Sequence, residues 1–296
     1  ATTLNNIASV YDDQGRYEEA LASYEEALSI EKESLGDRHP SVATTLNNIA
    51  SVYDDQGRYK EALAYYEEDL SISKESLGDR HPSVAITLNN IATVYKAQGR
   101  YKKALANYEE ALSIKKESLG DRHPDVAITL SNIALVYASQ GRYEEALANY
   151  KEDLSISKES LGDRHPDVAT TLNNIASVYD SQGRYKEALA YYEEDLSISK
   201  ESLGDRHPSV AITLNNIATV YKAQGRYKKA LANYEEALSI KKESLGDRHP
   251  DVAITLNNIA TVYKAQGRYE EALANCKEEL SISKESLGDR HPSVAI

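Results

Sequence analysis

The sequence contains no tryptophan, phenylalanine or methionine, and its single cysteine is Cys276. A hydrophobic core must therefore be built from Leu, Ile, Val, Ala and Tyr, and no disulfide can form within one chain. A lone cysteine is typical of a reducing compartment, which predicts a cytoplasmic protein. No apolar run approaches the roughly 20 residues that span a bilayer, and no signal peptide is recognisable, so we expect no membrane partner.

Positive charge is also scarce. The chain has 34 Lys and Arg against 47 Asp and Glu, which gives a net charge of −13. A phosphate backbone or an anionic membrane surface needs a basic patch, and an acidic protein repels both. We therefore expect no nucleic-acid partner.

What the sequence has in abundance is a repeat of 42 residues, which accounts for 294 of the 296 positions. A fixed period of this size predicts a solenoid, in which each copy buries its apolar face only against its neighbours. We predict a single repeat domain over residues 1–296. The copies are residues 1–42, 43–84, 85–126, 127–168, 169–210, 211–252 and 253–294, and residues 295–296 begin an eighth.

Each copy predicts two helices. In the first copy Leu4, Ile7, Ala8 and Tyr11 follow the i, i+3, i+4, i+7 spacing of an amphipathic helix, which ends at Gly15. A second apolar stripe runs over residues 17–35, opposite a face rich in Glu and Lys, and ends before a glycine. The copy is therefore a helical hairpin.

A short turn joins each copy to the next. In the first copy Gly36 ends the second helix, and Pro40 suits the first turn of the following helix, where its missing N–H costs nothing. His39 precedes that proline, and we expect a structural or N-capping role for it and for its counterparts up to His291.

These residues resemble a known family, the tetratricopeptide repeat. The 42-residue form, with its L-N-N-I-A and L-G-D-R-H-P segments, is similar to the cargo-binding domain of kinesin light chains and to arrays in bacterial signalling proteins. The resemblance implies an all-α fold, a right-handed α-solenoid superhelix of seven helix-turn-helix repeats. It also implies a non-catalytic protein–protein interaction scaffold without cofactors. The positions that carry the resemblance are Leu4, Ile7, Ala8, Tyr11, Ala20, Tyr24, Ala27 and Pro40.

The copies are more alike than those of a kinesin subunit. Residues 85–126 and 211–252 are identical, and residues 43–84 differ from 169–210 only by Asp55 against Ser181. We interpret this as either a recent duplication of a block of three copies, with a bacterial origin, or a designed array. The chain begins without Met at a repeat edge and stops two residues into the next copy, so we expect a fragment of a longer array or a designed chain based on one.

The resemblance implies that asparagines on the first helix of each copy face an extended peptide in a concave groove. A column of amides could hold a peptide backbone without demanding one sequence. The alternative is that one asparagine of each pair bonds a neighbouring helix and only orders the stack. The predicted peptide-binding residues are Asn5, Asn6, Asn47, Asn48, Asn89, Asn90, Asn132, Asn173, Asn174, Asn215, Asn216, Asn257 and Asn258.

Charge varies along the same face. Acidic residues such as Asp54 stand in some copies where others carry a lysine such as Lys96. Alternating zones would favour a ligand of mixed charge. Solvated helix ends with no partner are the equally simple interpretation.

No catalytic or metal site is expected. Histidines in stacked copies would lie about 10 Å apart, too far to share a metal with bonds near 2 Å. Asp37 and His39 have no nucleophile beside them, so we predict no enzyme activity. Cys276 takes the place of a tyrosine found in the six other copies, which predicts a buried position.

The array shows no polar cap at either end. The first and last helices would expose complementary apolar faces, which predicts head-to-tail self-association. Two further classes stay open beside the peptide-binding scaffold. One is a structural or self-assembling rod without a ligand, and the other is a sensor module attached to a catalytic domain.

Overall fold

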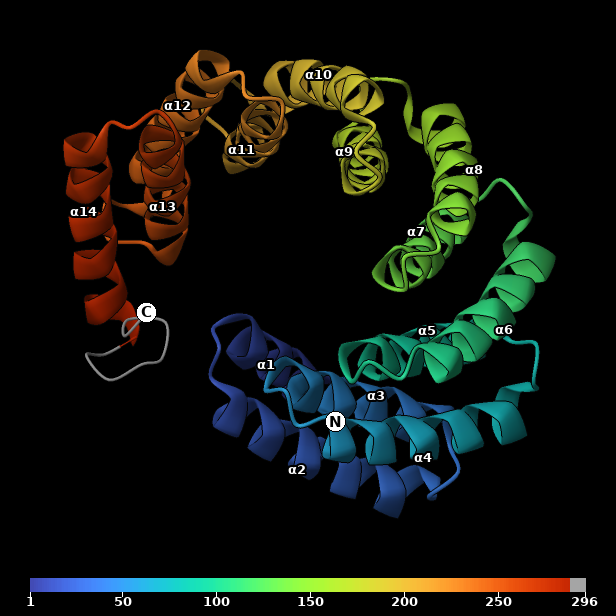
Figure 1. Cartoon of the computed structure of the whole chain (residues 1–296). Coiled ribbons are helices and arrows are strands. Elements are labelled where there is room, and N and C mark those ends of the chain that lie inside the picture. The colour runs from blue at the N-terminus through green and yellow to red at the C-terminus, as the bar shows by residue number, and fades with distance from the viewer. Residues whose placement is uncertain (288–296) are drawn as a thin grey trace. The chain divides into compact units, whose positions relative to one another are not determined.

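The computed structural model describes residues 1–287, and every regular element in that range is an α-helix (Figure 1). This confirms the all-α fold and the seven helix-turn-helix repeats, the last of which is described up to residue 287. The helices are α1 (Thr2–Asp13), α2 (Tyr17–Leu35), α3 (Pro40–Asp55), α4 (Tyr59–Leu77), α5 (Pro82–Ala97), α6 (Tyr101–Leu119), α7 (Pro124–Ser139), α8 (Tyr143–Leu161), α9 (Pro166–Ser181), α10 (Tyr185–Leu203), α11 (Pro208–Ala223), α12 (Tyr227–Leu245), α13 (Pro250–Ala265) and α14 (Tyr269–Leu287).

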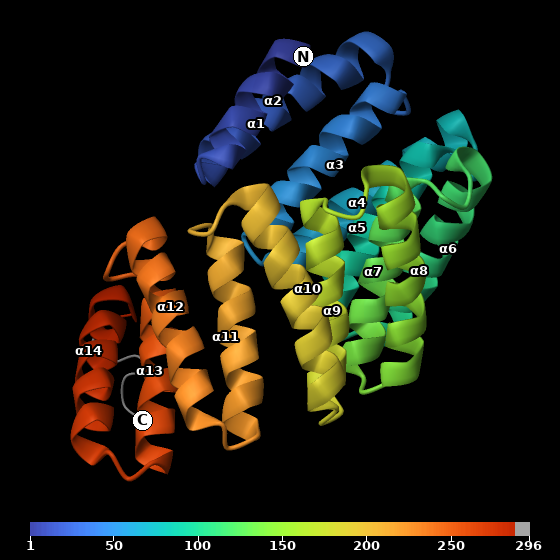
Figure 2. The same cartoon turned by 90° about the horizontal axis from the view of Figure 1, so that it is seen from above.

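The chain divides into two compact units, residues 1–156 and 157–296. The boundary falls inside α8, so no linker separates them. Within each unit the odd-numbered helices form one layer and the even-numbered helices the other, with successive hairpins side by side (Figures 1 and 2). The odd-numbered layer of each unit lies on the inner side of its curve. That residues 1–296 act as a single domain stays a prediction.

Glycines end the helices where the backbone must turn sharply. Gly57 adopts φ +70°, which lets the N–H of Arg58 reach the carbonyl of Tyr53 at 2.8 Å after α3. Gly78 has φ +94° after α4. A side chain is disfavoured at such φ values, so these turns need glycine.

Histidine caps the odd-numbered helices. Nδ1 of His39 accepts a hydrogen bond of 3.1 Å from the N–H of Ser41, one of the donors that the first turn of α3 leaves unpaired. The predicted capping role is thereby confirmed here and in the five copies that follow, whereas His291 lies outside the described residues. The other capping histidines are His81, His123, His165, His207 and His249.

The core runs from hairpin to hairpin without a break inside the first unit. One cluster of buried side chains extends from Ala8 in α1 to Val136 in α7. Ala8 and Ala20 are fully buried where the two helices of a hairpin cross, because only a small side chain allows that close approach. Tyr108 in α6 is fully buried and shares a hydrogen bond of 2.9 Å with Thr93. Each hairpin thus completes its neighbour's core.

The prediction for Cys276 is wrong, because this cysteine is exposed. The same place in the inner copies holds a buried tyrosine, such as Tyr108, on an even-numbered helix with a further hairpin packed against it. No described helix follows α14, so its outer face stays open. Leu273 on that face is 57% exposed, whereas the matching Leu231 is buried.

Ion pairs tie five of the interrepeat loops to the next even-numbered helix. Arg80 donates from Nε to Oε2 of Glu117 at 2.8 Å and from Nη2 to Oγ of Ser113 at 2.8 Å. Both charged side chains are about half exposed to solvent or more. Water therefore screens the attraction, and such pairs contribute little.

Replacing Arg80 by Ala should therefore lower the free energy of unfolding by only about 0.2–1 kcal/mol. Urea unfolding followed by circular dichroism measures the change. A double-mutant cycle with Glu117→Ala isolates the pair from other effects of the truncation. A coupling energy well above 1 kcal/mol would contradict this view of the loops.

Candidate functional site

The odd-numbered helices expose a recurring apolar side chain. Ile86 in α5 is 53% exposed, and the exposed fractions of the matching isoleucines in α7, α11 and α13 lie within a few per cent of that value. An asparagine follows four residues later in each, which puts it on the same helix face. In these four helices isoleucine and asparagine therefore line one surface together. The pairs are Ile86 with Asn90, Ile128 with Asn132, Ile212 with Asn216, and Ile254 with Asn258.

In three copies the first asparagine of the pair is engaged in the stack. Nδ2 of Asn47 donates to Oδ2 of Asp69 at 2.8 Å, and the same oxygen accepts from Oγ1 of Thr87 at 2.6 Å. Ser73 donates to Oδ1 of Asp69 at 2.8 Å. The network joins α3, α4 and α5, so it links one hairpin to the next. Asn173 with Asp195, and Asn5 with Glu31 and Thr45, repeat the arrangement.

In three copies the second asparagine reaches back to the preceding copy. Nδ2 of Asn90 lies 3.4 Å from Oδ1 of Asn47. Asn216 with Asn173 and Asn258 with Asn215 repeat this contact. Asn6 and Asn257 are exposed, and the other asparagines of the predicted set are half-buried. The structure thus brings the asparagines of consecutive copies together, and peptide binding by them stays a prediction.

Two positions on the even-numbered helices lie next to the asparagine network and carry different residues in different copies. In α4 they carry Asp69 and Ser73, whereas in α6 they carry Ala111 and Lys115. Nζ of Lys115 donates to Oγ1 of Thr129 at 3.0 Å, the threonine that corresponds to Thr87. Sequence reasoning missed these residues. The signal was present, because Asp occurs together with Ser in α4, α8 and α10, and Ala together with Lys in α6 and α12.

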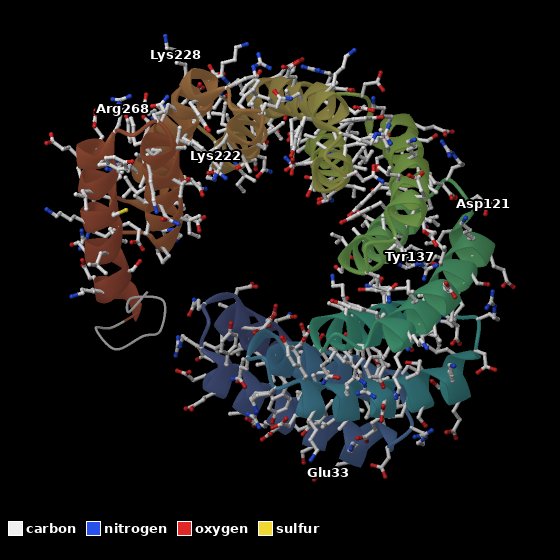
Figure 3. The ribbon with its side chains drawn as sticks, in the orientation of Figure 1. Glu33, Asp121, Tyr137, Lys222, Lys228 and Arg268 are labelled. Carbon is white, nitrogen blue, oxygen red and sulfur yellow. The ribbon has the colours of Figure 1, made fainter. Side chains whose placement is uncertain are left out.

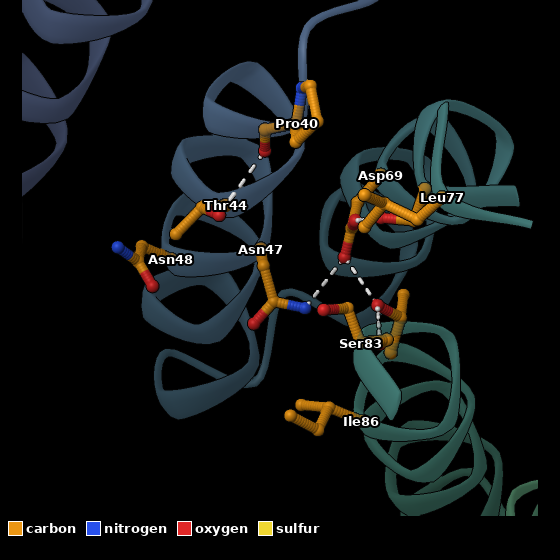
Figure 4. A pocket seen from close by; sticks show the side chains of 10 residues that line it. Pro40, Thr44, Asn47, Asn48, Asp69, Leu77, Ser83 and Ile86 are labelled. Atoms are coloured by element: carbon orange, nitrogen blue, oxygen red, sulfur yellow. Dashed lines mark hydrogen bonds between the residues drawn. The ribbon is translucent and has the colours of Figure 1, made fainter. Parts of the chain in front are cut away.

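Where aspartate and serine stand, a pocket of about 180 Å³ opens between three helices. Figure 4 shows Asp69 of α4 at its inner end, with Asn47 of α3 beside it and Ile86 of α5 at the rim. The second unit has the same pocket, 126 residues later in the sequence, with an equal volume of about 180 Å³. Its lining includes Asn173, Asn174, Asp195, Ser199, Ile212 and Thr213.

Burial shifts the ionisation of these inner groups. It raises the pKa of the Asp69 and Asp195 carboxyls, while hydrogen bonds from neutral side chains oppose part of that rise. Burial lowers the pKa of Lys115 and Lys241, which the nearby Asp125 and Asp251 partly offset. The hydrogen bonds that Asp69 accepts come from Asn, Thr and Ser, so its negative charge is only partly compensated.

A raised pKa in the folded state predicts a stability that depends on pH. For Asp69 and Asp195 the favourable contribution is present below the ordinary carboxyl pKa of 3.8 and is lost as pH rises through the raised value. The wild-type chain should therefore lose stability as the pH rises above about 4, relative to the double variant Asp69→Asn with Asp195→Asn. Urea midpoints at several pH values measure this difference. The other titratable groups are the same in both proteins, so their contributions cancel.

The matched control replaces the exposed Glu67 and Glu193 by Gln in the same two helices. Its difference from the wild type should stay flat over the same range. If the stability difference between the Asn variant and the wild type is equally independent of pH, the raised pKa assigned to Asp69 and Asp195 is contradicted.

Charges also meet on the odd-numbered layer. Lys96 in α5 is half-buried, and burial lowers its pKa while the attraction of Asp54 in α3 raises it. Figure 3 shows the matching Lys222 on the inner side of its unit, whereas Lys228 points away on the other side. Acidic and basic zones of consecutive copies therefore face one another across a repeat junction.

Two features are absent from the part of the chain that the structure describes. Residues 1–287 contain no group of three His, Cys, Asp or Glu side chains that could hold a metal ion. In the same range no helix combines the length and the apolar character that crossing a bilayer requires.

The sequence matches two family models, both described as tetratricopeptide repeat. The first matches residues 1–75, 55–117, 83–159, 125–201 and 196–243, and the second residues 252–293. The chain therefore belongs to the tetratricopeptide repeat family, whose members are generally non-catalytic scaffolds for protein interactions. A search of curated proteins gave no match.

Solved structures with the same architecture include kinesin-light-chain-like proteins. BtubC (BKLC) from P. vanneervenii is 26% identical with a TM-score of 0.66, covering 80% of this chain and 93% of that one. A putative kinesin light chain from Podospora anserina, with nearly identical TPR-like repeats, is 24% identical with a TM-score of 0.60, over 70% and 98%. A tetratricopeptide repeat protein from Parabacteroides merdae is 20% identical with a TM-score of 0.66, over 99% and 95%. The last two likenesses concern the fold alone.

Proposed function

We propose that the chain is an interaction scaffold that binds an extended polypeptide along the odd-numbered helices of a unit. The observation that carries this proposal is the repeated pairing of an exposed isoleucine with an asparagine one turn later, as in Ile86 with Asn90. Isoleucine offers apolar area that a soluble surface otherwise avoids in rows. The asparagine amide offers donors and an acceptor for a peptide backbone.

Hydrogen bonds between consecutive asparagines support the same role. An amide has two donors, so the bond from Asn90 to Asn47 still leaves it one N–H and its oxygen. The bond also restricts the side chain before any ligand arrives, which lowers the entropy that binding must overcome. The kinesin light chain resemblance supports peptide recognition on this face.

The test is a selection of 12-residue peptides from a random display library on the immobilised chain, followed by calorimetry. Asn90→Asp with Asn216→Asp should weaken the selected peptides at least tenfold. The matched control makes the same change in the same copies on the even-numbered layer, Asn107→Asp with Asn233→Asp, where the amide bonds only its own helix. Equal effects of the two double variants, or no selected peptide at all, would contradict the proposal.

We also propose head-to-tail self-association for this chain of 296 residues. Ile7 and Val10 on α1 are 42% and 54% exposed, and the matching Ile49 and Val52 of α3 are fully buried against the preceding hairpin. The open face of α14 carries Leu273, which corresponds to a leucine buried at inner junctions. The two open faces are therefore the two halves of an inner junction.

Sedimentation velocity over a concentration series tests this association. The wild-type chain should sediment faster as its concentration rises, and Val10→Glu should abolish the increase. The control Ile86→Glu changes an exposed isoleucine away from both open faces. A monomer at every concentration would contradict the proposal.

A further inference from the structure

The two pockets resemble the space that a lysine side chain occupies elsewhere in the same chain. Lys115 in α6 stands at the repeat position of Ser73, and its Nζ reaches Oγ1 of Thr129 at 3.0 Å and the carbonyl of Asp125 at 3.3 Å. Lys115 is 8% exposed, so this place accepts a nearly buried ammonium. Lys241 makes the same contacts with Thr255 and Asp251.

The copies that have a pocket differ from the copy containing α6 in two ways: they lack the lysine, and they carry an additional carboxylate. Ser73 stands where α6 has Lys115, which leaves the volume of the stem empty. Asp69 stands where α6 has Ala111, and it is only 3% exposed. The threonine that bonds the ammonium of Lys115 has its counterpart in Thr87, which here bonds Asp69. An empty alkyl channel thus ends at a buried negative charge.

The pocket combines apolar wall residues with a buried carboxylate, the two features that a lysine side chain needs. Pro40, Leu77 and Ile86 contribute apolar surface to its walls, and the carboxylate of Asp69 lies at its inner end. A carboxylate can accept about four hydrogen bonds, and Asp69 accepts three, from Asn47, Thr87 and Ser73. An ammonium group could add a charge-assisted bond there and compensate a charge that now has only neutral partners.

We propose that each pocket binds the side chain of a lysine carried by the polypeptide on the odd-numbered helices. The rim residues Thr44 and Ile86 are exposed on that same layer, so the pocket opens where the polypeptide would lie. The inference rests on the proposed function, because it supplies the side chain that such a polypeptide must carry. The matching pocket at Asp195 predicts the same preference in the second unit.

The test uses the full chain and small probes followed by saturation-transfer NMR. The tripeptide acetyl-Ala-Lys-Ala-amide should bind at least tenfold more tightly than the same peptide with norleucine or with acetylated lysine in the centre. Both replacements keep the alkyl stem and remove the charge. Equal binding of the charged and uncharged peptides would overturn the proposal.

The chain itself offers the control variant. Asp69→Ala with Ser73→Lys, combined with Asp153→Ala and Ser157→Lys and with Asp195→Ala and Ser199→Lys, gives the second, fourth and fifth copies the residues that the third and sixth already carry. This variant should fold, which circular dichroism checks, and it should bind the lysine peptide at least tenfold more weakly. The triple variant Asp69→Asn, Asp153→Asn and Asp195→Asn, which keeps the shape, should weaken binding similarly.

Two outcomes separate this inference from its alternatives. Butylammonium that binds as tightly as the lysine peptide would assign the pocket to a free amine and overturn the assignment to a polypeptide. The display selection could also yield peptides that lack lysine. If these peptides bind the variant that carries Ala and Lys in place of Asp and Ser as well as they bind the wild type, the inference is overturned. The peptide-binding scaffold would survive that second result, because its own test depends on Asn90 and Asn216.

Discussion

A peptide of residues 85–126, one complete copy, is expected to be largely unfolded in dilute solution at 25 °C. The ends of the array give the physical reason. Val94 is fully buried beside the preceding hairpin, whereas the matching Val10, which has no preceding helix, is 54% exposed. Leu105 is 8% exposed with a following hairpin, and Leu273 is 57% exposed without one. An excised copy would expose both faces at once.

Circular dichroism at 222 nm measures the expected loss of helix. The matched control is the fragment 1–126, which contains three copies and should keep most of its helical signal, since about three repeats give a stable stack. A single copy that melts cooperatively from a helical state would contradict the view that neighbouring hairpins supply the stability.

Tyr108→Ala is expected to give the largest loss of stability among the single substitutions, about 3–5 kcal/mol. Tyr108 is fully buried between α5, α6 and α7, and its hydroxyl bonds Thr93. Truncation leaves a cavity and removes a partner of that threonine. Because contacts extend only to adjacent hairpins, the damage should stay near the third copy.

Hydrogen exchange followed by mass spectrometry locates the effect. Residues 85–126 and 211–252 are identical in the wild type, so the substitution makes the α6 peptide distinguishable by mass from its unchanged copy in α12. Exchange should accelerate in the α6 peptide and not in the α12 peptide. Cys276→Ala, at the same repeat position on an open face, should change stability by less than about 0.5 kcal/mol. Uniform acceleration along the chain would contradict local coupling.

The sequence predicted the hairpins well because their determinants are local. Apolar spacing, Gly57 and Gly78 at the turns and His39 before Pro40 act within a few residues, and each recurs seven times or nearly so. Cys276 was mispredicted because its burial depends on whether another hairpin covers its helix. The repeat pattern alone assigns every copy an inner environment.

The pockets could not be predicted from one copy. Asp69, Ser73 and Thr87 lie on two helices of adjacent copies, and the two described pockets lie where serine replaces the lysine of α6. The paired change of Asp69 and Ser73 to Ala111 and Lys115 was the available signal. Its meaning depends on which threonine each side chain reaches, and that requires the stacked structure.

Identical copies also have a kinetic consequence. Helices α6 and α12 share one sequence, so each presents the same surface to whichever helix follows it. During refolding α7 and α13 therefore compete for either partner, within one molecule or between two. Refolding from urea should show slow, concentration-dependent phases from misaligned or domain-swapped arrays. Such traps are the kinetic disadvantage of a stack whose junctions are interchangeable.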